Sequence, residues 1–254
     1  MVGVDEVVER LRVAGCVFAE DEARLLRAET GGDRARLEDM LAERVSGVPL
    51  EQVLGWVSFA GVRVRMAPGV FVPRQRTELL VRTACERVEP GAVVVDVCCG
   101  SGAVAAALLR ARPGLRVWAC DVDERAVACA RLNLPGAEVR GGDLFEGLPA
   151  GLRGGVRVIT ANAPYVPSGA VGAMPPEARD HEPLVALDGG DDGLAVQRRV
   201  AAEAGRWLAP GGSVLIETGS DQAARTAGLL DGAGLVSRVV SCPEREATVV
   251  VGTS

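Results

Sequence analysis

The sequence has no lysine, since all 28 basic residues among its 254 are arginines. A Schiff-base lysine and the lysine of a P-loop are therefore excluded as functional groups. Aromatic residues are also scarce at 3%, whereas hydrophobic residues reach 48%, so the core must consist mainly of valine, leucine and alanine. This composition favours valine-rich buried strands packed under helices rich in alanine and leucine.

Few residues are suited to bind a metal or to form disulfides. A single histidine, His181, and seven cysteines without a C-x-x-C pair provide no zinc ligand set. The number of cysteines is odd, and the opening Met1–Glu6 lacks the basic and then apolar pattern of a signal peptide. No apolar run approaches the roughly 20 residues that a membrane span needs. These features predict a cytoplasmic protein with reduced thiols, no metal and no membrane segment.

The balance of charge limits the partners. With 34 acidic residues the formal net charge is −6, the wrong sign for a protein that binds nucleic acid over a broad surface. The length suits one α/β domain with a small appendage.

Hydrophobic periodicity divides the chain into three parts. Apolar residues recur at helical spacing at the start, which predicts a small helical domain over 1–50. Alternating residues after Trp56 predict a linker over 51–75 with a short β-hairpin. Strands and helices then alternate over 76–254, and the last two strands follow each other directly. We therefore predict a doubly wound α/β domain whose mostly parallel, seven-stranded sheet ends in an antiparallel hairpin.

The first strand of this domain leads into a nucleotide-type loop. Asp96 stands at the end of the strand, and Gly100-Ser101-Gly102 follows before an alanine-rich helix. The next residues do not complete G-x-G-x-x-G, which argues against a dinucleotide. An acid before G-x-G is instead the pattern of class I methyltransferases, whose cofactor is S-adenosylmethionine (SAM).

Two further acids end the following strands of the predicted sheet. Asp121 is placed to accept both ribose hydroxyls, and Asp143, before Leu144, lies where an adenine amino group is expected. Three acids in the same strand-end register favour a cofactor site over three unrelated turns. The residues expected to bind SAM from this pattern are Asp96, Cys98, Gly100, Gly102, Asp121, Asp143, Leu144 and Asn162.

Asn162-Ala163-Pro164-Tyr165 follows the fourth predicted strand and is the most specific motif of the chain. The fourth strand of such a fold points toward the reactive methyl group. An asparagine oxygen and a neighbouring backbone carbonyl can accept both hydrogens of an NH₂ group, and a tyrosine ring can pack on a planar group. We therefore expect Asn162, Ala163, Pro164 and Tyr165 to form the acceptor site for a planar amide or amine.

From about residue 20 onward the chain resembles the HemK/PrmC-type protein-(glutamine-N5) methyltransferases. The resemblance implies that Asn162 and the Ala163 carbonyl hold the acceptor amide, with Tyr165 against it. It also implies that Phe71 lies near the sulfonium methyl of SAM. The segments that carry the resemblance are 47–55 (GVPLEQVLG), 71–78 (FVPRQRTE), 162–165 (NAPY), 182–194 (EPLVALDGGDDGL) and 208–217, which contains the family's LxPGG…E pattern.

The chain departs from this family at four places. Ala163 gives NAPY where the family has NPPY, Cys98 replaces the first glycine of the cofactor loop, Gln75-Arg76 replaces a proline and an acid, and the N-terminal helical region is short. The leading hypothesis is methylation of a glutamine amide in a protein such as a release factor. Methylation of a small amide or amine metabolite, adenine-N6 methylation of nucleic acid and non-catalytic SAM binding stay open as alternatives.

Overall fold

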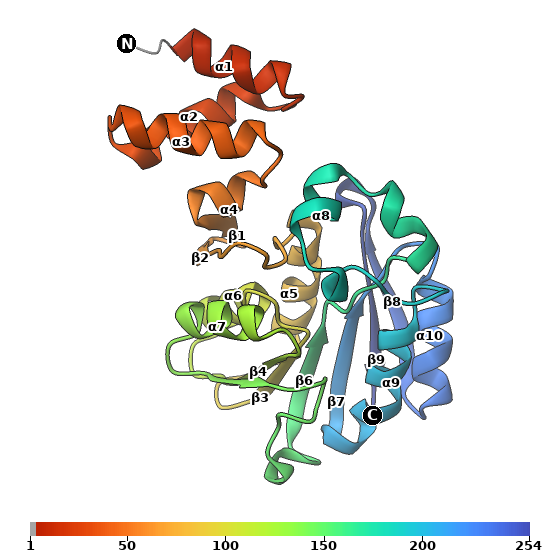
Figure 1. The fold of residues 1–254 in the computed structure, drawn as a ribbon. Coiled ribbons are helices and arrows are strands. Elements are labelled where there is room, and N and C mark those ends of the chain that lie inside the picture. Colours follow the sequence, from red (N-terminus) through yellow and green to blue (C-terminus); the bar gives the residue numbers. More distant parts are fainter. Residues whose placement is uncertain (1–3) are drawn as a thin grey trace.

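The computed structural model describes residues 4–254, and its N-terminal helices form a lobe beside an α/β body (Figure 1). The lobe has its own hydrophobic core, in which Val7, Leu11, Leu26 and Leu41 are fully or almost fully buried. Its helices, with the short one that leads out of it, are α1 (Val4–Val13), α2 (Ala19–Thr30), α3 (Arg34–Val45) and α4 (Leu50–Leu54).

A two-stranded antiparallel hairpin, β1 (Trp56–Phe59) and β2 (Val62–Arg65), follows the lobe. Ala60 and Gly61 both have positive φ at its turn, the geometry that matches the right-handed twist of a tight hairpin. At the end of β2, the side chain of Asn133 in the α/β body accepts a hydrogen bond from the backbone nitrogen of Arg65 and donates one to the backbone carbonyl of Arg65. The hairpin is thereby fixed to the α/β body.

The body is built on a seven-stranded sheet in the order β5-β4-β3-β6-β7-β9-β8. Five neighbouring strands pair in parallel, and β9 runs antiparallel to both of its neighbours, so that β8 has the direction of the other five. This confirms the predicted fold class, with the detail that β9 inserts between β7 and β8 so that β8 forms the edge. The strands are β3 (Val93–Val97), β4 (Arg116–Asp121), β5 (Glu138–Gly141), β6 (Val156–Ala161), β7 (Leu208–Glu217), β8 (Val236–Cys242) and β9 (Ala247–Thr253).

Helices cover both faces of the sheet, because alternate residues of each strand point to opposite sides. Val94 packs with α5, α6 and α7 on one face, and Val95 packs with α9 and α10 on the other. The helices of the body are α5 (Glu78–Cys85), α6 (Ala103–Ala111), α7 (Glu124–Asn133), α8 (Pro176–His181), α9 (Ala195–Trp207) and α10 (Ala223–Gly232). Among the described residues 4–254, no helix combines the length and the apolar character needed to cross a membrane.

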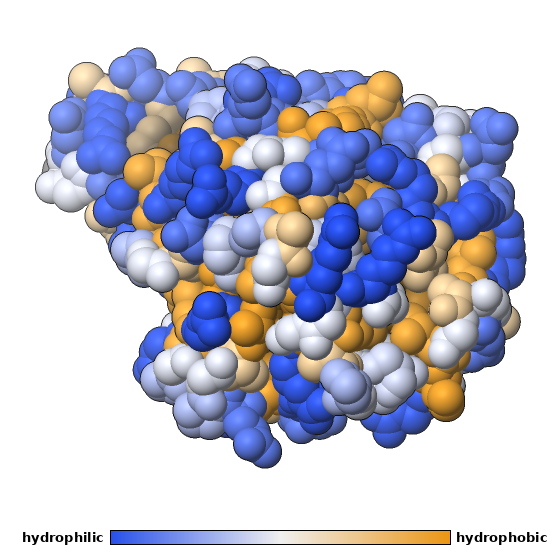
Figure 2. All heavy atoms as spheres, turned by 90° about the horizontal axis from the view of Figure 1, so that it is seen from below, coloured by the Kyte–Doolittle hydropathy of each residue, from blue (hydrophilic) through white to orange (hydrophobic). Residues whose placement is uncertain are grey.

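The order of the strands determines where a ligand can bind. The chain winds outward from β3 through β4 to β5, and then returns to place β6 on the other side of β3. Ligands of open α/β sheets bind at the carboxyl ends of the strands beside such a reversal. Figure 2 shows the molecule from below, and on this face apolar and hydrophilic residues are interspersed.

Candidate active site

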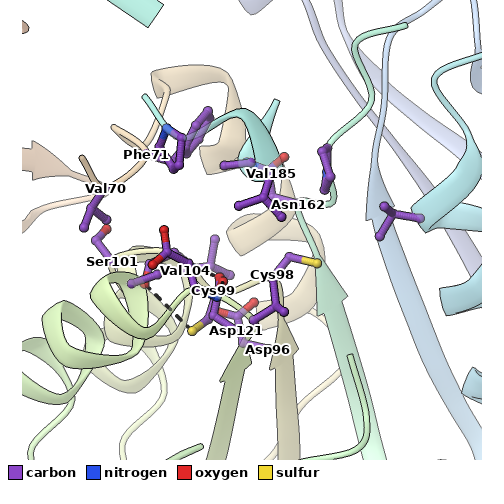
Figure 3. Close-up of a pocket in the computed structure, with 18 of the residues that line it drawn as sticks. Val70, Phe71, Asp96, Cys98, Cys99, Ser101, Val104, Asp121, Asn162 and Val185 are labelled. Atoms are coloured by element: carbon purple, nitrogen blue, oxygen red, sulfur yellow. Dashed lines mark hydrogen bonds between the residues drawn. The ribbon is translucent and has the colours of Figure 1, made fainter. Parts of the chain in front are cut away.

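A cavity of about 230 Å³ lies at the carboxyl ends of β3, β4 and β6. Figure 3 shows Phe71 and Val185 across the cavity from Asp96 and Asp121. The sequence-predicted site residues that line it are Phe71, Asp96, Cys98, Gly100, Asp121, Asp143, Leu144, Asn162 and Pro164. The lining does not include Gly102, Ala163 or Tyr165.

Asp96 is almost completely buried, with 1% of its surface exposed. Its Oδ1 accepts a 2.7 Å hydrogen bond from the hydroxyl of Thr160 on β6. Oδ2 has no hydrogen-bond partner within the described chain. Burial raises the pKa of Asp96 to about 7. A buried carboxylate oxygen at the wall of a cavity is an acceptor that a cationic ligand group can satisfy.

The loop after β3 is backbone-strained at Cys98, whose φ is +55°. A non-glycine residue rarely adopts this left-handed conformation, because its Cβ crowds the backbone. Leu144, after β5, has φ +53° and lines the same cavity. Burial raises the pKa of the Cys98 and Cys99 thiols, so both stay protonated near neutral pH.

Gly102 has a packing function that the sequence pattern does not reveal. It is the N-cap of α6, and a Cβ placed on it would lie 2.9 Å from Cδ1 of Leu134 and 3.2 Å from Cβ of Ala130. The absence of a side chain therefore allows the start of α6 to approach α7.

Asp121 and Asp143 lie in different environments at the cavity. Asp121 accepts from the backbone nitrogens of Gly100 (2.8 Å) and Asp123 (2.9 Å), which fixes its carboxylate against the loop. Burial raises its pKa, and these hydrogen bonds act in the opposite direction. Asp143 is partly exposed, and its Oδ2 forms a 2.7 Å ion pair with Arg199 of α9, which also lines the cavity.

Asn162 extends from the end of β6 into the cavity wall. Its Nδ2 donates a 3.4 Å hydrogen bond to Oγ1 of Thr77, a buried residue that also lines the cavity. Ala163 is 1% exposed, so its side chain is enclosed by protein. Thr77 belongs to the 71–78 segment, whose sequence pattern assigns this residue no function.

Glu182 is a second functional candidate, and the pattern of its segment, 182–194, assigns it no role. Its side chain is fully buried and accepts two hydrogen bonds from Arg74, at 2.7 and 2.8 Å, and one from the Val72 backbone nitrogen, at 3.1 Å. Arg74 also lies 4.9 Å from the centre of the Phe71 ring. Glu182 thereby joins the segment that carries Phe71 to the loop that carries Val185, and both segments line the cavity.

Tyr165 lies outside this cavity and lines a second, more open one of about 560 Å³ with Arg76. The guanidinium of Arg76 is 5.9 Å from the centre of the Tyr165 ring. Beneath them Glu217 is 3% exposed, with Oε1 3.6 Å from Nε of Arg76. Residues 77 and 164 line the first cavity, and their sequence neighbours 76 and 165 line the second. The two cavities are therefore separated by little more than the backbone of these segments.

No metal site accompanies this arrangement in the part of the chain that the structure describes, where no group of three or more His, Cys, Asp or Glu side chains could hold an ion. All seven cysteines are free thiols.

Known proteins are similar to this chain in sequence and in fold. A family model for the methyltransferase small domain matches residues 61–171. A release factor glutamine methyltransferase of Mycolicibacterium smegmatis is 37% identical over 246 residues, covering 88% of this chain and 85% of the relative. The chain belongs to the release factor glutamine methyltransferase family. It is therefore a methyltransferase, and the family resemblance inferred from its motifs is confirmed.

Two further comparisons show how far the likeness extends. A 4-amino-L-phenylalanine/4-methylamino-L-phenylalanine methyltransferase of Streptomyces pristinaespiralis is also 37% identical, over 79% of this chain and 71% of its own. A methyltransferase from Pyrococcus furiosus superposes with a TM-score of 0.56 at 16% identity, over 85% of this chain and 98% of that one. This second likeness supports the fold alone.

Proposed function

We propose that this protein transfers the methyl group of SAM to the side-chain amide nitrogen (N5) of a glutamine in a protein, with a release factor as the first candidate. The observation that carries the proposal is the position of Asn162. Its amide enters the same cavity as the strand-end acids, so a cofactor and an acceptor nitrogen can meet there.

The cavity fits the charge of SAM. The ammonium of its amino-acid part would satisfy Oδ2 of Asp96, the buried acceptor that has no partner in the described chain. Asp121 would accept the ribose hydroxyls, while the loop from Cys98 to Gly102 and Leu144 would enclose the rest, and Phe71 would cover the sulfonium. When bound, SAM would supply an electrophilic methyl group on a positively charged sulfur.

The acceptor site works by positioning. Asn162 Oδ1 and the Ala163 carbonyl would accept the two hydrogens of the acceptor NH₂, which directs the nitrogen lone pair toward the methyl. Pro164 restricts Ala163 to extended geometry and so fixes the direction of this carbonyl. Tyr165 would border the entry of the acceptor from the second cavity. Because the amide proton is lost only after the nitrogen attacks, no strong base is required, and His181 does not line the cavity.

Methylation of a small amine or amide is a second candidate. The phenylalanine-derivative methyltransferase of Streptomyces pristinaespiralis matches this chain at the same 37% identity as the release factor enzyme, so identity does not separate the two acceptors. The replacement of NPPY by NAPY lies directly at the acceptor site. Adenine-N6 methylation and a non-catalytic role have no comparable observation in their favour.

We propose that the protein acts in the cytoplasm. A release factor is found there, and seven free thiols suit a reducing compartment.

A transfer assay tests the proposal. The purified protein is incubated with methyl-labelled SAM and, separately, with the host's release factors, 4-amino-L-phenylalanine and a lysate of its host. Label on a release-factor glutamine, absent with Asn162→Ala, supports the proposed function. Label on the free amino acid supports the second candidate, and no transfer to any acceptor contradicts both. Binding of SAM to Asn162→Ala, measured by calorimetry, must stay within about threefold of the parent so that the loss can be assigned to the acceptor site.

A further inference from the structure

Three elements meet at the hydroxyl of Thr77, beneath the candidate acceptor site. Thr77 precedes α5 and is 1% exposed, Asn162 follows β6, and Glu217 ends β7 and is 3% exposed. Asn162 Nδ2 donates to Thr77 Oγ1 at 3.4 Å. The Thr77 hydroxyl also acts on the carboxylate of Glu217, whose pKa it lowers. The groups thus form a buried chain from the cavity wall to an acid of the sheet.

The chain of hydrogen bonds has one direction. A carboxylate can only accept hydrogen bonds, and a hydroxyl has a single proton to give. If Thr77 gives that proton to Glu217, it can only accept from Asn162, so the asparagine must present Nδ2 rather than Oδ1 to it. The other end of the amide, Oδ1, is then turned away from Thr77.

Arg76 favours the charged form of Glu217 that this direction requires. Its Nε lies 3.6 Å from Oε1 of the carboxylate, and neither this Nε nor Oε2 of Glu217 has a hydrogen-bond partner in the described chain. Burial raises the pKa of Glu217, whereas the Thr77 hydrogen bond and the charge of Arg76 act in the opposite direction. Arg76 stands where the family segment carries an acid, so this support belongs to the present chain.

We infer that Thr77 and Glu217 are positioning residues that hold Asn162 with Oδ1 toward the acceptor, and that they thereby select an acceptor group that donates hydrogens, such as NH₂. With the amide reversed, Asn162 would present NH₂ to an acceptor NH₂, and two donors form no hydrogen bond. This inference rests on the proposed function of Asn162 and adds the residues that set its orientation.

The orientation can be measured without any acceptor. The chain has two asparagines, Asn133 and Asn162, so selective ¹⁵N labelling of asparagine gives two side-chain NH₂ signals. Asn162→Ala assigns them, and Asn133, which donates to the carbonyls of Arg65 and Ser101, is an internal control.

In Thr77→Val, which removes the hydroxyl at nearly constant size, the Asn162 hydrogens should exchange with solvent about tenfold faster or more. Thr77→Ser should retain the slow exchange, and Asn133 should not change in either variant. Unchanged exchange at Asn162 in Thr77→Val would overturn the inference. If Thr77→Val fails to fold, Glu217→Gln answers the same question, because a neutral amide no longer fixes the direction of the Thr77 hydroxyl. Unaltered Asn162 signals in Glu217→Gln would then be the refuting result.

Kinetics with the acceptor identified in the transfer assay provide the second readout. Thr77→Val should lower kcat about tenfold to a hundredfold while the Kd for SAM stays within about threefold, and Thr77→Ser should recover most of the loss. Equal kcat for Thr77→Val and the parent contradicts a positioning role. A parent protein that transfers no methyl contradicts the proposed function instead, and the exchange measurement still decides the orientation.

Discussion

Replacement of Asp96 by asparagine should change how the stability of the ligand-free protein depends on pH. The carboxylate is 1% exposed, and burial raises its pKa to about 7 from an ordinary value of 3.8. Asparagine keeps an oxygen that can accept from the Thr160 hydroxyl and removes the titration. The substitution therefore isolates the free energy of holding a charge at this position.

The sign of the effect follows from proton binding. Between pH 4 and 7 the folded protein keeps a proton on Asp96 that the unfolded chain has released, so this group's contribution to stability is full below pH 4 and is lost as the pH rises to about 7. A shift of about three pKa units corresponds to up to about 4 kcal/mol. Asp96→Asn should thus match the parent near pH 4 and exceed its unfolding free energy by up to about 4 kcal/mol above pH 7.

Denaturant unfolding at several pH values tests this difference. Subtracting the Asp96→Asn curve from that of the parent removes the titration of all other groups. Asp143→Asn is the matched control, because it makes the same substitution at a carboxylate that is partly exposed and paired with Arg199. Parallel pH profiles for the parent and Asp96→Asn would refute the account of a buried, incompletely satisfied carboxylate.

Four further substitutions probe the cofactor loop and the acceptor motif. Asp121→Ala should weaken SAM binding by about 1–3 kcal/mol in calorimetry, since hydrogen bonds to both hydroxyls are lost, and unchanged affinity in a folded variant would contradict the ribose assignment. Cys98→Gly should change the unfolding free energy by less than about 1 kcal/mol, because relief of the +55° strain offsets the added entropy of the unfolded chain. The neighbouring Cys99→Gly should cost clearly more, as Cys99 is the more deeply buried of the two and has no positive φ whose strain glycine would relieve. Ala163→Pro should alter kcat by less than about tenfold, since Ala163 contributes its carbonyl, and a larger change would show that alanine adapts the site to its acceptor.

Most of the α/β body could be predicted from the sequence, because its patterns are local. The two strands that follow each other directly at the end of the chain form the antiparallel pair β8 and β9, and the alanine-rich helix expected after Gly102 is α6. The N-terminal lobe was less predictable. Leu25 and Val45 fit the helical spacing, yet they are 36% and 39% exposed, since apolar spacing alone does not reveal which neighbour covers a short helix.

The composition of the cavity could be predicted only in part. Strand-end acids are set by topology, so Asp96, Asp121 and Asp143 meet as expected. Thr77 and Glu182 gave no separate signal, because their functions depend on partners 85 and 110 residues away in the chain. Tyr165 lies only three residues after Asn162 but faces another cavity. In an extended segment successive side chains point to opposite sides, so residues an odd number of positions apart face different ways.

The unfavourable features of this fold gather at one place, and their combination argues for a ligand. Cys98 and Leu144 have left-handed backbone geometry without being glycine, and Asp96 buries an oxygen without a partner. Each costs on the order of 1–3 kcal/mol in the ligand-free protein, and all three residues line the same cavity. A cationic ligand that satisfies Asp96 removes part of this cost on binding and therefore stabilises the fold through the site itself. These departures from ordinary backbone geometry and hydrogen bonding therefore gather at the cavity that we propose binds SAM, as expected when local folding preferences yield at a functional site.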